Sequence, residues 1–319
     1  AGKSVVSSNK ELVATHGYEL LQLAREHGVS YLFEASVGGG IPIIRPLHQC
    51  LGANEIDNIE GILNGTTNFI LTKMRREHSS FSEALEQAQA LGYAESDPTA
   101  DVEGIDACRK ICILASLAYG RQIYPEAVHC EGIGKLTPED TEYAEDWGGV
   151  IKLIAKASRS QDGQTVSMLV APMFVPQDSQ LAGIDDVFNG ILVDGDATGE
   201  VLFYGKGAGK LPTASAVVAD VIDALKEGVK VHDSLFWKPA VKPEGLLEDR
   251  NTYPWYLRVT GVAAALLPSV AGAGHVVFED NGEAAYLVGA ATSADIAAVT
   301  EKIEVLGGKV ALAMKKLED

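Results

Sequence analysis

The sequence has few cysteines, few aromatic residues and no long hydrophobic run. Its 319 residues include four cysteines, and aromatic side chains make up 7%. Four cysteines in a chain of this length exclude a disulfide-stabilised scaffold, and their positions form neither a CxxC redox pair nor a set of zinc ligands. The apolar stretch at residues 262–270 is too short to cross a bilayer, and the N-terminus shows no signal-peptide pattern. We therefore expect a reducing, cytoplasmic location.

Basic residues are scarce beside acidic ones. Lysine and arginine number 26 against 44 aspartates and glutamates, so the formal net charge is −18. An acidic chain repels phosphate backbones and anionic lipids, so we expect no nucleic-acid partner and no membrane partner. Hydrophobic residues at 46% and charged residues at 22% are ordinary for a globular protein, and the length suggests about two domains.

Several common catalytic and nucleotide-binding motifs are missing. The seven histidines show neither HxH nor HxxxH spacing, and no GxSxG elbow marks a serine nucleophile. Gly38-Gly39-Gly40 lacks the GxGxxG spacing of a dinucleotide-binding turn. Residues 205–213 lack the spacer of a P-loop, although a glycine-rich loop before a helix is a natural place for a phosphate or a substrate.

The hydrophobic periodicity predicts an α/β fold, a substrate-binding sheet domain followed by a small α+β module. The expected strands are residues 3–8, 29–35 and 58–63, with shorter strands over 130–204. The expected helices are residues 10–25, 43–51, 64–78, 81–91, 102–119 and 213–225. Residues 227–252 are charged and contain proline, which is typical of a linker. A β-α-β-β-α-β order is expected for the final segment, with elements at 256–260, 262–270, 275–279, 284–289, 293–306 and 309–314.

Three charged residues could form an acid–base site. Asp106 and Lys110 are four residues apart on a predicted helix, so they share one face, and Glu95 lies in the acidic loop before that helix. Two carboxylates beside a lysine can hold a substrate ammonium group while the lysine gives a proton to a carbonyl oxygen. On spacing alone, a surface ion pair is the more common explanation of Asp106 and Lys110.

Glu34 precedes a loop with three consecutive glycines, Gly38–Gly40. Glycine carbonyls and one carboxylate could surround a hard cation, or the loop could bring backbone close to a ligand. A tight strand-to-helix turn explains the same pattern without any ligand. Lys10, after Asn9 at the start of the first helix, would by itself be an ordinary solvated lysine.

Taken together, these segments resemble homoserine dehydrogenase. The resemblance rests on four segments in order, namely Lys3–Lys10 (KSVVSSNK), Phe33–Ile44 (FEASVGGGIPII), Gly61–Asn68 (GILNGTTN) and Gly92–Lys110 (GYAESDPTADVEGIDACRK). Weaker agreement continues through residues 134–140, 151–153 and 205–220, so the resemblance covers residues 1–225. The order of these motifs is more specific than any one of them.

The resemblance implies a reaction and a proton donor. The reaction would be reversible hydride transfer between NAD(P)H and L-aspartate 4-semialdehyde, which gives L-homoserine in threonine, methionine and isoleucine biosynthesis. Lys110 would give its proton to the aldehyde oxygen, and Asp106 would support that lysine and the substrate. Lys10 would lie where the nicotinamide meets the substrate and assist the proton transfer.

The resemblance also implies binding residues. Glu95 would bind the substrate amino group, and Gly65 and Thr66 would border the substrate. Gly92 and Gly209 would line the cofactor together with Lys10. A sodium ion would be bound by Glu34 and by the carbonyls of Val37, Gly39 and Ile41.

The family places a Rossmann nucleotide-binding domain ahead of the Asn-Lys segment, and this sequence starts just before that segment. We therefore expect residues 1–10 to be a remnant of that domain. Residues 11–226 would form the substrate-binding and catalytic domain, whose loop and helix at 205–226 would pack on the nucleotide-binding domain. This chain alone is then expected to bind NAD(P) poorly and to turn over negligibly.

Residues 253–319 resemble an ACT domain, the small regulatory unit often appended to this family, with Gly261-Val-Ala-Ala-Ala in place of the usual Pro-Gly after its first strand. Regulation by threonine is therefore a hypothesis. The family resemblance further implies a small-molecule substrate and a homodimer or tetramer. Two alternatives stay open, a non-catalytic regulatory or oligomerisation module and another amino-aldehyde oxidoreductase.

Overall fold

The computed structural model describes residues 2–160, 163, 165–227, 235–240, 246–247 and 252–317. Its helices are α1 (Lys10–Glu26), α2 (Gly65–Glu77), α3 (Phe81–Ala90), α4 (Thr99–Val102), α5 (Ile105–Ala118), α6 (Pro138–Asp146), α7 (Lys210–Glu227), α8 (Leu267–Ala271) and α9 (Ser293–Val305). Its strands are β1 (Val5–Val6), β2 (Tyr31–Leu32), β3 (Ile56–Ile62), β4 (His129–Cys130), β5 (Gly149–Arg159), β6 (Val166–Pro176), β7 (Phe188–Gly195), β8 (Gly199–Lys206), β9 (Leu246–Leu247), β10 (Tyr253–Thr260), β11 (Gly274–Asp280), β12 (Glu283–Ala291) and β13 (Lys309–Lys316). The predicted α/β class is confirmed. In the described ranges, no helix is long and apolar enough to cross a membrane.

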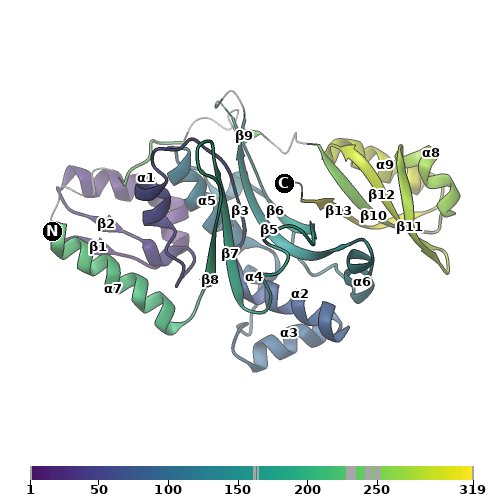
Figure 1. Ribbon diagram of the computed structural model, residues 1–319, viewed down its shortest axis with the longest axis horizontal. Coiled ribbons are helices and arrows are strands. Elements are labelled where there is room, and N and C mark those ends of the chain that lie inside the picture. The colour runs from purple at the N-terminus through teal and green to yellow at the C-terminus, as the bar shows by residue number, and fades with distance from the viewer. Residues whose placement is uncertain are drawn as a thin grey trace.

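A small β-α-β unit forms one end of the molecule (Figure 1). β1 and β2 pair in parallel, with Val5 opposite Tyr31, and α1 makes the crossover that parallel neighbours need. α7 comes from much later in the chain and lies along the same unit, where it contacts β1. The expected domain boundary at residue 10 therefore falls inside this unit.

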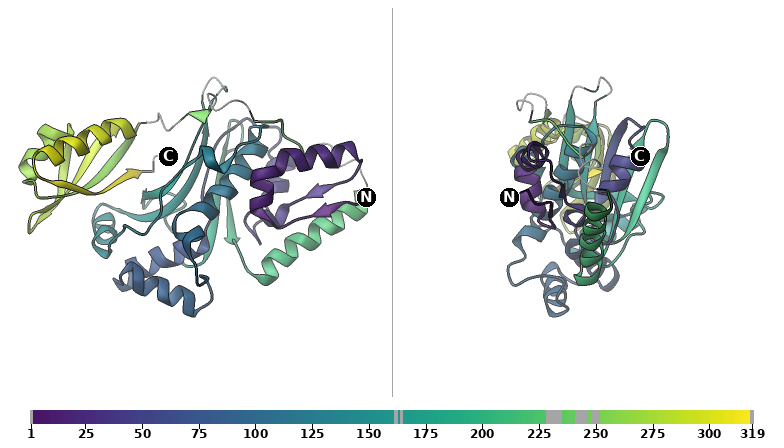
Figure 2. Two further views of the ribbon diagram at one scale, coloured as in Figure 1. Left: turned by 180° about the vertical axis from the view of Figure 1, so that it is seen from behind. Right: turned by 90° about the vertical axis from the view of Figure 1, so that its left-hand side faces the viewer.

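The large sheet runs from the centre of the molecule into its C-terminal end (Figure 2). Among the described strands, its order is β11-β12-β10-β13-β6-β5-β3-β7-β8, with β4 and β9 paired to β6. α5 packs against β3 and β5. This packing places the first turns of α2 and α5 near the end of β3, where the predicted catalytic residues lie.

The structure differs from the sequence prediction in several places, among them the helix predicted at 43–51, which is a short π-helix at Pro46–Cys50, and the strand predicted at 3–8, which is only β1. Instead of short strands over 130–204, β5 and β6 are each 11 residues long, and residues 168–175 of β6 form one continuous, buried apolar run. The same region contains α6, and a capping box formed by Thr137 and Asp140 fixes the start of this helix. The strand predicted at 29–35 is only β2, because a 3₁₀ turn follows at Glu34–Ser36.

Part of the predicted linker is packed against the rest of the chain. The Trp237 side chain is 1% exposed, and its indole N–H donates to Gln122 Oε1 at 2.9 Å. A Cβ on Gly17 would lie 2.3 Å from the Trp237 ring, so the helix α1 approaches this tryptophan closely. Residues 228–234, 241–245 and 248–251 of that linker lie outside the described residues.

The C-terminal module has the predicted β-α-β-β-α-β order, formed by β10, α8, β11, β12, α9 and β13. Its strands are antiparallel in the order β11-β12-β10-β13. β13 also pairs in parallel with β6, where Lys315 lies opposite Met173, and this pairing joins the module to the central sheet. The resemblance to an ACT domain stays a prediction.

A buried ion pair also joins the C-terminal module to the rest of the chain. Asp140 of α6 is fully buried, and its carboxylate accepts hydrogen bonds from Arg258 of β10 at 2.7 and 3.2 Å. The backbone N–H and hydroxyl of Thr137 donate to the same carboxylate. Burial raises the pKa of Asp140, and the Thr137 hydrogen bonds and the Arg258 charge oppose that rise.

A second charged cluster ties α7 to the segment after β2. Arg45 Nη1 lies 2.5 Å from Asp223 Oδ2, Nη2 lies 3.6 Å from Asp220 Oδ1, and Nε lies 3.2 Å from Glu34 Oε2. Asp220 also accepts the backbone N–H of Glu34 at 2.9 Å. Burial raises the pKa of Asp220 to about 6, although the Glu34 N–H and the Arg45 charge lower it. Three carboxylates therefore converge on one guanidinium.

Replacing Arg258 with Ala should lower the free energy of unfolding by about 3 kcal/mol, because it leaves a fully buried carboxylate without its cation. Urea unfolding followed by circular dichroism measures this loss. Arg159, which pairs with the exposed Glu55 and Asp57, is the matched control, and Arg159→Ala should cost less than about 1 kcal/mol. Equal losses in the two variants would contradict the structural role of the Asp140–Arg258 pair.

Replacing Asp220 with Asn should raise the melting temperature at pH 8. Since the folded state raises the Asp220 pKa to about 6, it binds that proton more tightly than the unfolded chain. The ionised carboxyl therefore costs stability above about pH 6, and the cost disappears as the pH falls toward the ordinary carboxyl range near 4. Thermal unfolding of both proteins from pH 8 to pH 4 should show the difference shrinking, whereas a constant difference contradicts this account.

Candidate active site

A buried carboxylate lies at the centre of the predicted catalytic residues. Asp106 stands in the first turn of α5 and is 3% exposed. Its Oδ2 accepts hydrogen bonds from Lys110 Nζ at 2.6 Å and from Asn64 Nδ2 at 2.9 Å. Its Oδ1 lies 2.6 Å from Lys10 Nζ. One carboxylate thus bridges two lysine ammonium groups.

Lys110 lies one helical turn after Asp106, as the spacing predicts. Its side chain is 9% exposed, so the alternative of a surface ion pair is wrong. Its ammonium also donates to the carbonyl of Leu63 at 2.7 Å, at the end of β3. Because an ammonium carries three hydrogens, these two contacts leave one N–H for another acceptor.

Lys10 reaches the same carboxylate from α1. The Asn9 side chain accepts the N–H of Leu12 at 3.0 Å, and this N-cap makes Lys10 the first residue of the helix. The Lys10 side chain is 42% exposed, far more than that of Lys110. The Lys10–Asp106 pair therefore joins the β1-α1-β2 unit to α5 and leaves Lys10 open to solvent or a ligand.

The two lysines decide the charge of Asp106. Burial raises the pKa of Asp106, but the charges and hydrogen bonds of Lys110 and Lys10 lower it by more. The net pKa is therefore well below the ordinary value. Asp101 behaves differently. Burial raises its pKa, the hydrogen bond from Asn64 opposes that rise, and the charge of Asp106 adds to it. At neutral pH, Asp106 is an anion between two cations.

Asn64 is a functional candidate to which the sequence prediction assigns no role. It is the N-cap of α2, where its Oδ1 accepts the N–H of Thr67 at 2.8 Å. Its Nδ2 donates to Asp101 at 2.7 Å and to Asp106 at 2.9 Å. The signal in the sequence is the Asn-Gly-Thr-Thr cap, but the two carboxylate partners come from tertiary packing.

Gly65 and Thr66 follow Asn64 directly, so the predicted border of the substrate is next to the lysine site. A Cβ on Gly65 would lie 2.8 Å from the carbonyl of Val187, so this position is tightly packed against the start of β7. The Thr66 hydroxyl donates to the carbonyl of Tyr93 at 2.7 Å. This bond connects α2 to the loop that contains Gly92 and Glu95.

Glu95 and Gly92 lie in that loop and are exposed. The Glu95 backbone carbonyl accepts a hydrogen bond from Gln89 at 3.0 Å. Among the described residues, no ion pair joins the Glu95 carboxylate to Lys10 or Lys110. Gly92 has a φ of 75°, which suits glycine, and its α-carbon faces open space. The structure therefore supports a turn at Gly92 and does not test the binding roles of either residue.

Two glycine loops meet beside this site. The N–H of Gly40 donates to the carbonyl of Lys206 at 2.9 Å, and a Cβ on Gly39 would lie 2.6 Å from the carbonyl of Gly207. Gly209, with a φ of 121°, lies just before α7. The loop predicted to bind a cation and the loop predicted to line the cofactor are thus in backbone contact.

The Glu34 carboxylate does not fit the predicted sodium site. Its Oε1 accepts the N–H groups of Ile43 and Ile44 at 2.7 and 2.9 Å, and its Oε2 accepts Arg45 N and Nε at 2.9 and 3.2 Å. Four donors, one of them cationic, occupy the four lone-pair sites of a carboxylate. Glu34 instead caps the start of the short helical segment at residues 44–50. In the described part of the chain, no group of three or more His, Cys, Asp or Glu side chains could hold a metal ion.

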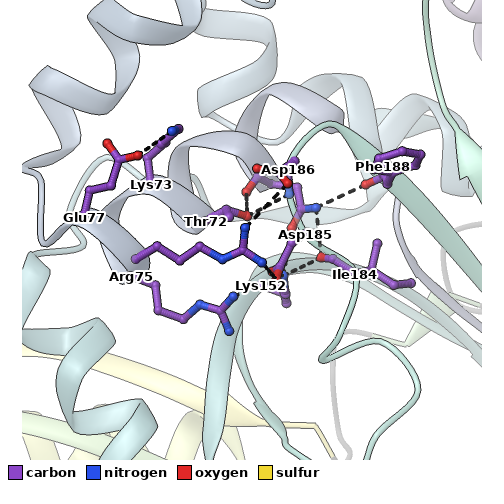
Figure 3. Close-up of polar contacts among 11 residues, drawn as sticks. Thr72, Lys73, Arg75, Glu77, Lys152, Ile184, Asp185, Asp186 and Phe188 are labelled. Carbon is purple, nitrogen blue, oxygen red and sulfur yellow. Dashed lines mark hydrogen bonds and ion pairs between the residues drawn. The ribbon is translucent and has the colours of Figure 1, made fainter.

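A second buried lysine anchors the start of β7 (Figure 3). Lys152 of β5 is 2% exposed, and its Nζ contacts Ile184 O at 2.5 Å, Asp185 Oδ1 at 3.0 Å and Asn68 Oδ1 at 3.1 Å. Arg75 pairs with the other oxygen of Asp185 at 2.8 Å. Burial lowers the pKa of Lys152 to about 8, and the charge of Asp185 opposes that fall. These groups are paired with one another and hold α2, β5 and β7 together.

The chain matches the family model "Homoserine dehydrogenase" over residues 42–222. A homoserine dehydrogenase from Synechocystis sp. is 52% identical over 225 residues, which is 70% of this chain and 52% of the relative. One from Neisseria gonorrhoeae is 47% identical over 264 residues, which is 81% of this chain and 60% of the relative. This chain therefore spans between half and two thirds of the length of these curated relatives.

Solved structures agree with this assignment. A homoserine dehydrogenase from Thiobacillus denitrificans superposes on this chain with a TM-score of 0.87 at 36% identity. The match covers 99% of this chain and 76% of the Thiobacillus chain. A hyperthermophilic archaeal homoserine dehydrogenase mutant, solved in complex with NADPH, has a TM-score of 0.60 at 34% identity over 70% of this chain and 64% of its own. The family model covers more than half of the sequence, and the fold and the order of motifs agree with it. This chain belongs to the homoserine dehydrogenase family.

Proposed function

We propose that the gene product containing this chain interconverts L-homoserine and L-aspartate 4-semialdehyde with NAD(P) as the cofactor. The observation that carries the proposal is the buried Asp106 carboxylate between Lys110 and Lys10, with lysine-to-carboxylate distances of 2.6 Å on both sides. Family membership supports the same reaction class. An oxidoreductase that reduces an aldehyde needs a proton donor beside the carbonyl oxygen, and a lysine with one unoccupied N–H meets that need.

The chain's own residues would stabilise the charge that develops on the substrate oxygen. Lys110 Nζ would donate a hydrogen bond, and then a proton, to that oxygen as it becomes an alkoxide, and would accept the proton in the reverse direction. Asp106 would keep the ammonium oriented through its 2.6 Å hydrogen bond. Lys10 would add a second positive charge from the more exposed side.

We expect the cofactor to be bound by residues of the segments around this site. A bound nicotinamide would supply or accept the hydride. Lys10 and the loop at Gly209 would contact it, with Gly92 on the opposite loop. Glu95, Gly65 and Thr66 would bind or border the amino-acid part of the substrate. The Glu34 carboxylate is not part of this proposal, because N–H donors already saturate it, and a sodium ion at the carbonyls of Val37, Gly39 and Ile41 stays a prediction.

Further properties stay predictions. They are the cytoplasmic location, the homodimer or tetramer, the absence of nucleic-acid and membrane partners, the ACT-like character of residues 253–319 and the response to threonine. The same holds for the expectation that this chain alone binds NAD(P) poorly.

Replacing Lys110 with Ala should lower kcat for homoserine oxidation about a thousandfold in the gene product that contains this chain, because it removes the proton donor and acceptor. Absorbance of the reduced cofactor measures the rate, and thermal unfolding verifies that the variant is folded. Lys156→Ala is the matched control, since Lys156 has a side chain 12% exposed and pairs with Glu60 at 2.8 Å, away from the proposed reaction.

The control should keep its rate within about threefold. If Lys110→Ala changed only stability or assembly, the chain would be a non-catalytic module, as one alternative holds. If the unmodified protein acted on other amino aldehydes and not on aspartate semialdehyde, the other alternative would be correct.

A further inference from the structure

Asn189 carries a buried polar group that the structure leaves without a partner. It stands in β7, and the residue is 1% exposed. Among the described residues, nothing hydrogen-bonds its side-chain oxygen Oδ1. A buried carbonyl oxygen without a hydrogen-bond donor lowers the stability of the fold. Such an oxygen therefore suggests that a ligand supplies the donor.

The Asn189 side chain lies against the loop that precedes α7. Its backbone pairs with Gly205 in the β7–β8 ladder. A Cβ on Gly207 would lie 2.1 Å from Nδ2 and 2.5 Å from Oδ1, so only glycine at 207 allows the amide to lie on the loop backbone. This is the loop whose next glycine, Gly209, we expect to line the cofactor.

The same amide is close to the lysine site. Gly190 pairs with Ile62 in the β3–β7 ladder, so the next residues along these antiparallel strands are Asn189 and Leu63. Leu63 supplies the carbonyl that accepts Lys110 Nζ at 2.7 Å. A Cβ on Gly65 would lie 3.5 Å from Asn189 Oδ1. Asn189 therefore stands between the proton donor, the expected substrate border and the expected cofactor loop.

We propose that Asn189 is a cofactor-binding residue, whose Oδ1 accepts a hydrogen bond from the carboxamide N–H group of the nicotinamide. The proposal rests on the function proposed above. An uncharged acceptor in a buried position suits an uncharged amide donor, because a buried ammonium beside an amide alone would lack a counter-charge. The substrate ammonium has carboxylates available instead, such as the half-buried Asp101 or the exposed Glu95.

The structure also holds Asn189 in a fixed position. Asn68 of α2 donates from Nδ2 to the carbonyls of Ile184 at 3.0 Å and Phe188 at 3.1 Å. Phe188 directly precedes Asn189, and Lys152 Nζ donates to Asn68 Oδ1 at 3.1 Å. These bonds fix the backbone next to Asn189, and a residue whose backbone is fixed before the ligand arrives loses less entropy on binding.

The test compares Asn189→Ala with the parent gene product that contains this chain. Fluorescence titration gives the Kd of NADPH and of 2′-phospho-ADP-ribose, which lacks the nicotinamide, and steady-state kinetics give the KM of homoserine. We expect the NADPH Kd to rise about tenfold, with the Kd of 2′-phospho-ADP-ribose and the KM of homoserine changed less than about twofold. The melting temperature without ligand should stay level or rise, because an unpaired buried amide is removed.

Asn54→Ala is the matched control. Asn54 lies beside Gly195 at the other end of β7, and its amide is paired with Leu51 O and Thr198 N, both at 3.1 Å. It should leave the NADPH Kd unchanged. Asn189→Ser replaces Asn189→Ala if the latter does not fold.

Three results would overturn the assignment of Asn189. They are an unchanged NADPH Kd, equal weakening of both nucleotides, and a rise confined to the KM of homoserine. If the parent protein binds NADPH but does not act on homoserine, the proposed reaction fails, while the two nucleotide titrations still decide the role of Asn189.

Discussion

The site depends on one buried carboxylate that two lysines keep ionised. Asp106 contacts Lys110 from its own helix and Lys10 from the β1-α1-β2 unit, both at 2.6 Å. A buried anion is stable only when it is paired, and each lysine is oriented by the same anion, so the three charges require one another. This arrangement connects the two parts of the chain that must meet for chemistry, α1 at one end and α5 against the central sheet. Asn64 adds an amide donor and fixes the start of α2 in the same contact.

Close backbone contacts complete the site. Gly39, Gly65 and Gly207 each lie where a Cβ would come within 3 Å of a neighbouring atom. Gly39 lets the loop after β2 approach the loop before α7, while Gly65 and Gly207 let the start of α2 and the loop before α7 pack against Val187 and the Asn189 side chain. Glu34 and Arg45 then hold these loops through backbone N–H groups and the acidic residues of α7. The charged residues near the glycine loops thus mainly hold the loop after β2 against α7.

Sequence patterns predicted the features that depend on interactions between residues close together in the chain. The four-residue spacing placed Asp106 and Lys110 on one face, and Asn9 marked the start of α1. The C-terminal module was predictable in part because Asn281 and Gly282, with φ values of 48° and 83°, make the tight hairpin between β11 and β12. The contact of Lys10 with Asp106, the partners of Asn64 and the unpaired amide of Asn189 depend on packing between distant segments. Glu34 was misinterpreted as a cation ligand because the N–H groups that saturate it come from residues nine to eleven positions later, in a conformation that spacing does not reveal.

The charge of Asp106 can be measured directly. The ¹³Cγ resonance of this residue, assigned by its loss in Asp106→Asn, reports the protonation of the carboxyl group during an NMR pH titration. Because the two ammonium groups hold the Asp106 pKa well below its ordinary value, the resonance should stay at its ionised position as the pH falls through about 4, where exposed aspartates take up protons. A midpoint at or above about 4 would contradict the account, since the lysines would then not be held by an anion.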